Sequence, residues 1–239
     1  GAVVLTWNVP ALGDTQLKLD GPTIADIFLG RITKWNDSRL AALNPGVKLP
    51  NADLIVVHRS DGSGTSYIFT DYLSKISPEW KDKVGKATSV NWPVGLGGKG
   101  NEGVTQEVKQ TEGTIGYVEL IYAVANKLPY AQVKNPAGDY IVPSLAGVTA
   151  AAASAKFDKG TDFRVSITNA PGKDSYPISS FTWLLVRPKL KDAAKSKALK
   201  DFLSWMLTDE AQQMANQLQY ASLPAEVIRL EQERIKGLK

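Results

Sequence analysis

The sequence predicts an α/β fold in which many of the strands pair in parallel. Apolar runs typical of buried strands alternate with segments of helical periodicity along the 239 residues. The composition, 43% hydrophobic and 22% charged, is ordinary for a folded chain. The length is enough for a sizeable core, in one large domain or two small ones.

Most predicted strands are short apolar runs. A core strand opens the sequence, and the run that begins at Leu54 is apolar up to His58. Residues 163–168 alternate between apolar and polar side chains, which is typical of a half-buried strand. The strands are predicted at 1–9, 54–58, 114–119, 163–168 and 176–186, with a short extended piece at 17–19.

Helix signals lie between these runs. Asp20 followed by Pro22 is typical of a helix start, Gly30 of its end, and Ser144 is a plausible cap for a later helix. Residues 122–134 fit a helix or a strand equally well. Helices are predicted at 20–30, 37–43, 66–73, 78–84, 103–110, 142–155, 192–207, 209–218 and 224–238.

The composition excludes several classes of site. The sequence has no Cys, so disulfides, thiol nucleophiles and Cys metal sites are excluded. Its single His argues against a His-based zinc site or a Ser-His-Asp triad. The net charge of +4 is spread along the chain, which gives no support for nucleic-acid binding. No apolar run is long enough for a membrane span.

The sequence begins without Met, directly in a predicted core strand. Chain ends usually lie loose on a surface. We therefore expect that a segment upstream of Gly1 has been removed, cleaved or lies outside this sequence.

A candidate anion site lies at residues 54–65. An apolar strand runs into Arg59, a turn rich in glycine and serine follows, and a helix begins near Thr65. This arrangement points free backbone N–H groups and the helix dipole at one spot. Arg59 and the hydroxyls of Ser63 and Thr65 add donors, and Asp61 is placed to hold Arg59 in a bidentate pair.

Other interpretations of these residues remain open. Asp, Ser, Gly and Thr also form ordinary capped turns, although such a turn does not explain an Arg at the end of a buried strand. The glycine cluster at 95–103 lacks the ending of a nucleotide-binding loop, which favours a structural loop before a helix from Gly103. His58 is interpreted as a buried, hydrogen-bonded residue.

Several blocks resemble the substrate-binding proteins of phosphate ABC transporters, the PstS type. The blocks occur in the family's order and are spread over nearly the whole chain. They are residues 19–21, 27–37, 58–65, 69–73, 89–103, 113–119 and 176–182.

The resemblance implies a two-lobed periplasmic binding protein (type 2-like), each lobe a mixed sheet flanked by helices. Residues 10–167 would form the second lobe, with the anion loop. Residues 1–9 and 168–239 would be the remainder of an incomplete first lobe, which would expose unpaired edges and apolar surface. The implied phosphate ligands are Arg59, Ser63, Gly64 and Thr65, with Asp61 in support.

The implied function is capture of inorganic phosphate in the cleft between the lobes and delivery to a membrane ABC permease. It implies a periplasmic monomer without catalytic residue, metal or cofactor. The family's ligands from its N-terminal segment, including the acidic acceptor of the phosphate proton, do not occur in this sequence. Two alternatives remain: a phosphate-ester hydrolase that uses Ser63 or a bound water, and a secreted phosphate-binding adhesion or matrix protein.

Overall fold

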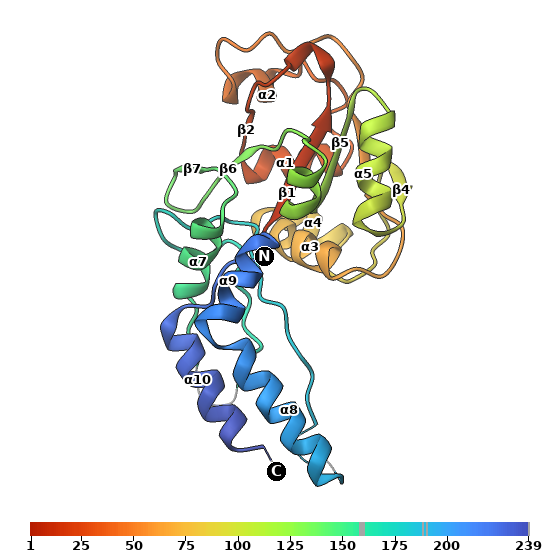
Figure 1. The fold of residues 1–239 in the computed structure, drawn as a ribbon. Helices are drawn as coiled ribbons and strands as arrows, with labels where there is room; N and C mark the ends of the chain where they lie inside the picture. Colours follow the sequence, from red (N-terminus) through yellow and green to blue (C-terminus); the bar gives the residue numbers. More distant parts are fainter. Residues whose placement is uncertain (158–160, 188, 190, 239) are drawn as a thin grey trace.

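The computed structural model describes residues 1–157, 161–187, 189 and 191–238. Figure 1 shows a body of strands and helices, from which helices α8 (Ala193–Met206) and α10 (Ala225–Lys236) extend. The prediction of a mixed α/β fold is confirmed.

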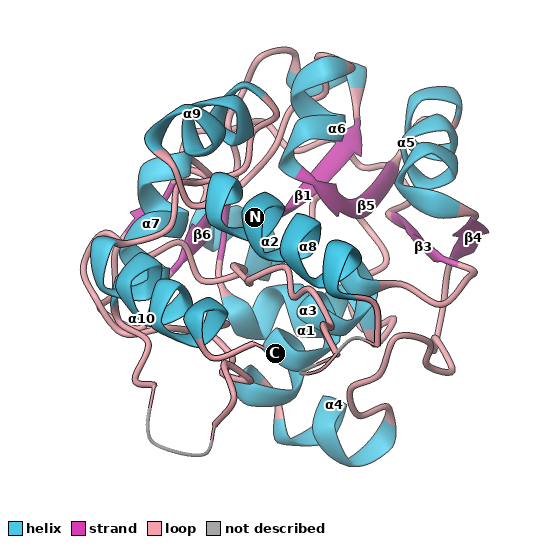
Figure 2. Cartoon of the chain, turned by 60° about the horizontal axis from the view of Figure 1, so that its bottom comes forward, coloured by secondary structure: helices cyan, strands magenta, loops and turns pink. Residues whose placement is uncertain are grey.

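The larger sheet has the strand order β1-β5-β3-β4. Strand β3 (Ile55–Arg59) lies parallel to both of its neighbours, β5 (Thr114–Glu119) and β4 (Leu96–Gly98). Strand β1 (Val3–Asn8) pairs antiparallel with β5 over its whole length. Figure 2 shows the four strands in this order, with β4 at the outer edge. The parallel pairing predicted from the alternation of strands and helices is therefore present.

A smaller sheet consists of three short strands. Strand β2 (Lys18–Leu19) is parallel to β6 (Gln132–Lys134), which is antiparallel to β7 (Tyr140–Ile141). The segment 122–134, which fitted a helix or a strand equally well, contains parts of both, since helix α6 (Leu120–Ala125) precedes β6.

The predicted helices are all present, with shifted ends. Ser144 caps α7 as expected, because its hydroxyl accepts from the Gly147 N–H at 3.1 Å. Besides α6, α8 and α10, the helices are α1 (Gly21–Phe28), α2 (Ser38–Leu43), α3 (Gly64–Ile76), α4 (Pro78–Lys83), α5 (Gly100–Gln110), α7 (Leu145–Ala153) and α9 (Asp209–Gln217), with a 3-10 turn at Pro10–Leu12.

One large core fills the body. It joins the buried side chains of β1, β3 and β5 to those of α1, α3 and α5, and includes the fully buried rings of Trp7, Trp35, Trp80 and Tyr117. Burying aromatic rings of this size contributes strongly to stability. The core holds β3 and α3 in place, and these two elements flank the candidate anion site.

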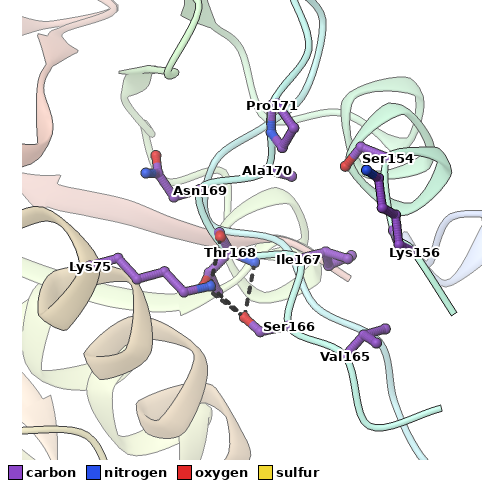
Figure 3. Close-up of a pocket in the computed structure, with 11 residues that line it drawn as sticks. Lys75, Ser154, Lys156, Val165, Ser166, Ile167, Thr168, Asn169, Ala170 and Pro171 are labelled. Atoms are coloured by element: carbon purple, nitrogen blue, oxygen red, sulfur yellow. Dashed lines mark hydrogen bonds between the residues drawn. The ribbon is translucent and has the colours of Figure 1, made fainter. Parts of the chain in front are cut away.

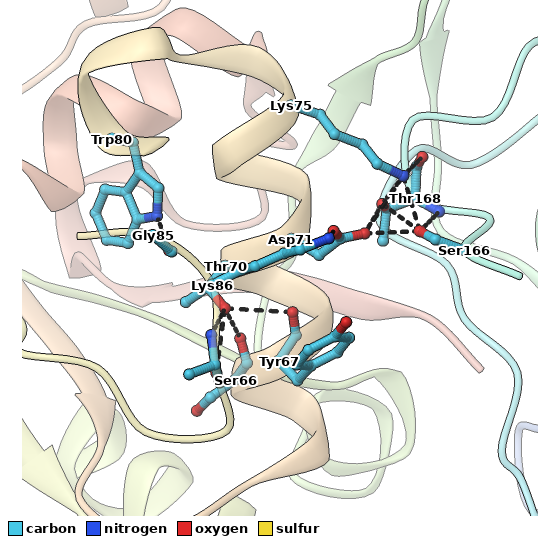
Figure 4. A network of polar contacts seen from close by, with 11 residues as sticks. Ser66, Tyr67, Thr70, Asp71, Lys75, Trp80, Gly85, Lys86, Ser166 and Thr168 are labelled. Atoms are coloured by element: carbon cyan, nitrogen blue, oxygen red, sulfur yellow. Dashed lines mark hydrogen bonds and ion pairs between the residues drawn. The ribbon is translucent and has the colours of Figure 1, made fainter. Parts of the chain in front are cut away.

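The prediction of a strand at 163–168 is wrong. The segment has no sheet neighbour among the described residues, and Ser166 and Thr168 attach it to α3 instead. Both hydroxyls donate to the Asp71 carboxylate at 2.6 Å (Figure 4). Lys75 donates to Ser166 and Thr168, and Lys86 donates to Asp71 at 2.5 Å. Alternating side chains therefore serve here as polar anchors rather than as a strand face.

The long core strand predicted at 176–186 is also wrong. Residues 178–180 pair with residues 1–3: the Val3 N–H donates to the Ile178 carbonyl, the Ser180 N–H donates to the Gly1 carbonyl, and Ala2 and Ser179 form an isolated bridge. Beyond Ser180, the backbone of residues 181–187 has no strand partner among the described residues. Leu184 and Leu185 are accordingly 56% and 94% exposed, although the sequence pattern places them in a core.

The C-terminal arm, helices α8 to α10, buries little apolar surface. Its buried apolar residues are Leu203, Ala211, Val227 and Ile235. Several large side chains here and just before α8 are exposed, namely Trp183, Leu184, Leu185, Phe202, Trp205, Met214 and Leu218. In the described part of the chain, no helix has the length and hydropathy to cross a membrane.

Candidate functional site

The loop between β3 and α3 brings Arg59 and Asp61 together in the predicted geometry. Arg59 is the last residue of β3, and its side chain is only 10% exposed. Its Nε donates to Oδ1 of Asp61 and one terminal nitrogen, Nη2, donates to Oδ2, both at 2.8 Å. This bidentate pair fixes the plane of the guanidinium group. Within the described residues, Nη1 has no acceptor.

The pair is charged at neutral pH. The hydrogen bonds from Arg59, followed by one from the Gly100 N–H at 3.1 Å, hold the pKa of Asp61 well below its usual range. The bond to Asp61 raises the pKa of Arg59. The guanidinium group is thus a permanent, oriented cation at the end of a strand.

The first turn of α3 lies immediately after this cation. Ser63 is the N-cap: its hydroxyl accepts from the Ser66 N–H at 3.2 Å, and its own N–H donates to the Thr88 carbonyl at 2.8 Å. The N–H groups of Gly64 and Thr65 have no acceptor among the described residues. Unpaired N–H groups at the positive end of a helix dipole favour an anion.

The two hydroxyls predicted as donors are both buried. Ser63 and Thr65 are 4% exposed, and Gly64 between them is exposed. The Thr65 hydroxyl donates to the Glu119 carboxylate at 3.0 Å. In this structure, therefore, the donors of the loop that have no acceptor among the described residues include the Gly64 and Thr65 N–H groups and Nη1 of Arg59, but not the Thr65 hydroxyl.

Sequence reasoning missed three side chains around the loop. The Tyr117 hydroxyl accepts from the Arg59 N–H at 3.2 Å and lies 2.6 Å from the Ser66 hydroxyl. Asn101 and Glu119 contact Thr65. All three belong to blocks that carry the family resemblance, which was the only available sign of their position.

The glycine cluster at 95–103 supports the loop from the opposite side. It forms β4 and the start of α5, three residues earlier than predicted, and places the Gly100 N–H on Asp61. His58 is half-buried and stacks on Trp92 at 4.9 Å between ring centroids. Burial lowers its pKa, and Nδ1 lies 3.1 Å from the Arg59 carbonyl, as expected for a hydrogen-bonded histidine.

A hollow of about 480 Å³ lies elsewhere, beside the end of α3 (Figure 3). Lys75, Ser166 and Thr168 line it together with residues 154–156 and 169–171. The Lys75 amine already donates to Ser166 and to both oxygens of Thr168. None of the predicted anion-site residues lines this hollow.

A family model and curated relatives match the chain. The model is described as a PBP superfamily domain and matches residues 1–210. A phosphate-binding protein PstS of Xylella fastidiosa (strain 9a5c) is 48% identical over 96% of this chain and 63% of its own length. Proteins of the same name from Pasteurella multocida and Haemophilus influenzae are 45% and 43% identical, over 95% of this chain and 66% and 68% of their lengths. The chain thus spans less than two thirds of the first of these relatives.

Solved structures show the same fold at low sequence identity. A phosphate-binding protein from Stenotrophomonas maltophilia aligns with a TM-score of 0.66 and 18% identity, over 97% of this chain and 68% of its own. A periplasmic phosphate-binding protein, PfluDING, aligns with a TM-score of 0.69 and 18% identity, over 96% and 68%. From the family model and the relatives together, the chain belongs to the PBP superfamily, in the family of the PstS proteins.

Proposed function

We propose that this chain binds inorganic phosphate at the loop from Arg59 to Thr65. The observation that carries the proposal is the oriented guanidinium group of Arg59, held by Asp61 next to two unpaired N–H groups at the start of α3. A planar cation and backbone donors at one helix end suit the tetrahedral oxygens of a phosphate. The proposed ligand residues are Arg59, Ser63, Gly64 and Thr65.

The names of the relatives support this ligand. The Xylella, Pasteurella and Haemophilus proteins are all named phosphate-binding proteins. The blocks by which the sequence resembles that family include the anion loop itself, residues 58–65.

The proposed role is transport rather than catalysis. A PstS-type protein would carry phosphate to a membrane ABC permease from the periplasm, as a monomer of two lobes. The division into 10–167 on one side and 1–9 with 168–239 on the other belongs to this proposal. Closure of the lobes over the ligand would need hydrogen bonds and no covalent step.

The structure offers little to the hydrolase alternative. The Ser63 hydroxyl caps α3 and is 4% exposed. Among the described residues, no side chain that could serve as a base is hydrogen-bonded to it. The adhesion alternative has no specific observation in its favour.

Calorimetric titration of the 239-residue chain with inorganic phosphate tests the proposal. Arg59→Ala should weaken binding by about 2–4 kcal/mol, because the anion loses a desolvated, charge-assisted partner and Asp61 loses its bidentate cation and keeps only the Gly100 N–H. Arg229→Ala is the matched control, since Arg229 forms an exposed ion pair with Glu233 on α10. It should leave the affinity unchanged.

Equal affinity of Arg59→Ala and the unchanged chain would remove the loop as the phosphate site. Hydrolysis of a phosphate ester by the unchanged chain, lost in Ser63→Ala, would replace binding with catalysis as the proposed function.

A further inference from the structure

The Glu119 carboxylate is shared between the anion loop and the C-terminal arm. Glu119 is the last residue of β5. Its Oε1 accepts from the Thr65 hydroxyl at 3.0 Å, and its Oε2 accepts from the Tyr220 hydroxyl at 2.6 Å. Tyr220 follows α9, so one carboxylate joins residues 155 positions apart in the chain through two hydrogen bonds.

Asn101 completes this arrangement from the start of α5. Its amide nitrogen lies 3.3 Å from Oε1 of Glu119 and 3.4 Å from the Thr65 hydroxyl, and its oxygen accepts from the Glu119 N–H at 3.4 Å. Asn101 is 7% exposed. The carboxylate is therefore held by side chains from α3, α5 and the segment after α9.

This geometry decides where the Thr65 proton points. A hydroxyl has one hydrogen to donate. In this structure the Thr65 hydroxyl gives it to Glu119, in a charge-assisted bond about twice as strong as a neutral one. An anion at the first turn of α3 receives this donor only if the hydroxyl turns away from Glu119.

Hydrogen bonds from Tyr220 and Asn101 to Glu119 make this rotation of the Thr65 hydroxyl easier. When Thr65 leaves, the carboxylate still accepts from both of them, so it is not left without partners. Without Tyr220, Glu119 would hold the Thr65 hydroxyl more firmly.

We infer that Glu119 is a positioning residue that competes with the bound anion for the Thr65 hydroxyl, and that Tyr220 relieves this competition. The inference rests on the proposed phosphate site. It links the arm to the affinity of the loop through two hydrogen bonds.

The negative charge of Glu119 also affects which charge state of the anion binds best. An anion that takes the Thr65 hydroxyl would lie roughly 6 Å from the Glu119 carboxylate, the span of two hydrogen bonds. Like charges at that distance repel, and a doubly charged anion is repelled more than a singly charged one. Glu119 therefore favours the singly charged form of phosphate over the doubly charged form.

We call the contact from Tyr220 through Glu119 to Thr65 the relay. Titration with inorganic phosphate at low salt tests it, because each variant should change the affinity in a stated direction. Glu119→Gln should tighten binding about 3- to 10-fold, since a neutral amide holds the hydroxyl less strongly and repels less. Tyr220→Phe should weaken binding about 2- to 5-fold, and should have little effect in a chain that already carries Glu119→Gln. Tyr140→Phe is the matched control, because Tyr140 lies on β7 of the smaller sheet, with its ring under Lys18 and Lys134.

The pH profile separates this role from mere packing. Among the titratable groups that face Glu119, Tyr122 and Tyr220 have a raised pKa and stay neutral, whereas burial lowers the pKa of the Gly1 ammonium to about 6. Between about pH 6 and pH 8 phosphate loses its second proton and the Gly1 ammonium loses its charge. The gain from Glu119→Gln should therefore grow, because the dianion predominates and the Glu119 charge is less neutralised. A variant that only loosened the loop would give the same fold-change at both pH values.

The outcomes distinguish the relay from the site. If Glu119→Gln and Tyr220→Phe both weaken binding while Arg59→Ala weakens it as proposed above, the inference about Glu119 and Tyr220 is wrong and the phosphate site stands. If Arg59→Ala has no effect, the proposed function at this loop fails first.

Thermal unfolding without phosphate provides a second measurement. Thr65→Val should lower the Tm of the unchanged chain by more than it lowers that of Glu119→Gln, because the hydrogen bond it removes is weaker there. Equal losses would show that the Thr65–Glu119 bond does not exist in solution, which would also overturn the relay.

Discussion

At the scale of single residues, Asp71 is a buried carboxylate whose burial depends on its hydrogen bonds and ion pairs. Its side chain is 2% exposed, yet it is surrounded by donors from three segments. Lys86 and Lys75 supply charge, and Ser166 and Thr168 supply hydroxyls. Burial of a charge without such partners would be strongly unfavourable. Asp71 therefore anchors the segment at 166–168 to the helix that carries the anion loop.

This anchor predicts a specific loss of stability in acid. Burial alone raises the pKa of Asp71, but the Lys86, Ser166 and Thr168 hydrogen bonds and the Lys75 charge outweigh it and lower the pKa from 3.8 to about 2. A lowered pKa in the folded state contributes stability that is present above about pH 4 and lost as the pH falls towards 2. The contribution is about 2 kcal/mol.

Urea unfolding between pH 5 and pH 2.5 measures the contribution. Asp71→Asn should be less stable than the unchanged chain at pH 5, and the difference should shrink as the pH falls. Asp201→Asn is the control, since Asp201 pairs with Lys197 on the exposed face of α8. A pH-independent difference for Asp71→Asn would contradict the assigned role of the charge.

The contacts of the candidate site differ in how well the sequence predicts them. Arg59 and Asp61 are two positions apart on one turn, so their pairing follows from local chain geometry. Glu119 meets Thr65 across 54 positions and Tyr220 meets Glu119 across 101, through tertiary packing that no local pattern encodes. The Thr65 hydroxyl was therefore predicted as a free donor, whereas it is already engaged.

At the scale of elements, Gly98 sets how closely β4 and α5 approach. A Cβ on Gly98 would lie 2.5 Å from the Val104 N and 2.6 Å from the Gly103 carbonyl carbon, and backbone atoms cannot move aside locally. Gly98→Ala should therefore cost about 1–3 kcal/mol of unfolding free energy by overpacking. It should also displace the Gly100 N–H from Asp61 and weaken phosphate binding.

Denaturant unfolding with Gly62→Ala as control checks this prediction. A Cβ on Gly62 would meet nothing within 4 Å, and that glycine needs no left-handed backbone. Gly62→Ala should keep the unfolding free energy within about 0.5 kcal/mol. Equal stabilities for Gly98→Ala and Gly62→Ala would show that β4 and α5 separate at no cost.

Elements were predictable where their causes are local. Caps such as Ser63 and Ser144 begin helices through bonds within one turn, and those helices were found. A strand instead needs a neighbour for its backbone groups. Residues 163–168 and 181–186 have the side-chain pattern of strands, but the described part of the chain offers them no neighbouring strand, so the pattern alone predicts the wrong structure. Conversely, β4 is glycine-rich and was missed because its pairing with β3 makes it a strand.

At the scale of the whole molecule, stability is unevenly distributed. The body has a continuous core around β1 and β5, whose side chains are almost fully buried. The C-terminal arm has one or two buried residues in each helix. Opening free energy follows the apolar area that an element buries. The arm should therefore open without the body.

Native-state hydrogen exchange with mass spectrometry makes that difference measurable. Amides of α8 and α10 should exchange through openings of lower free energy than those of β1 and β5, because opening them exposes little new apolar surface. Leu203→Ala removes the one buried side chain of α8. It should speed exchange in α8 and leave β5 unchanged, whereas Val118→Ala in the core should speed exchange in β5 and leave α8, which opens without the body, unchanged. If Leu203→Ala sped exchange in β5 as much as in α8, the arm and the body would unfold as one unit, and the uneven distribution of stability would be wrong.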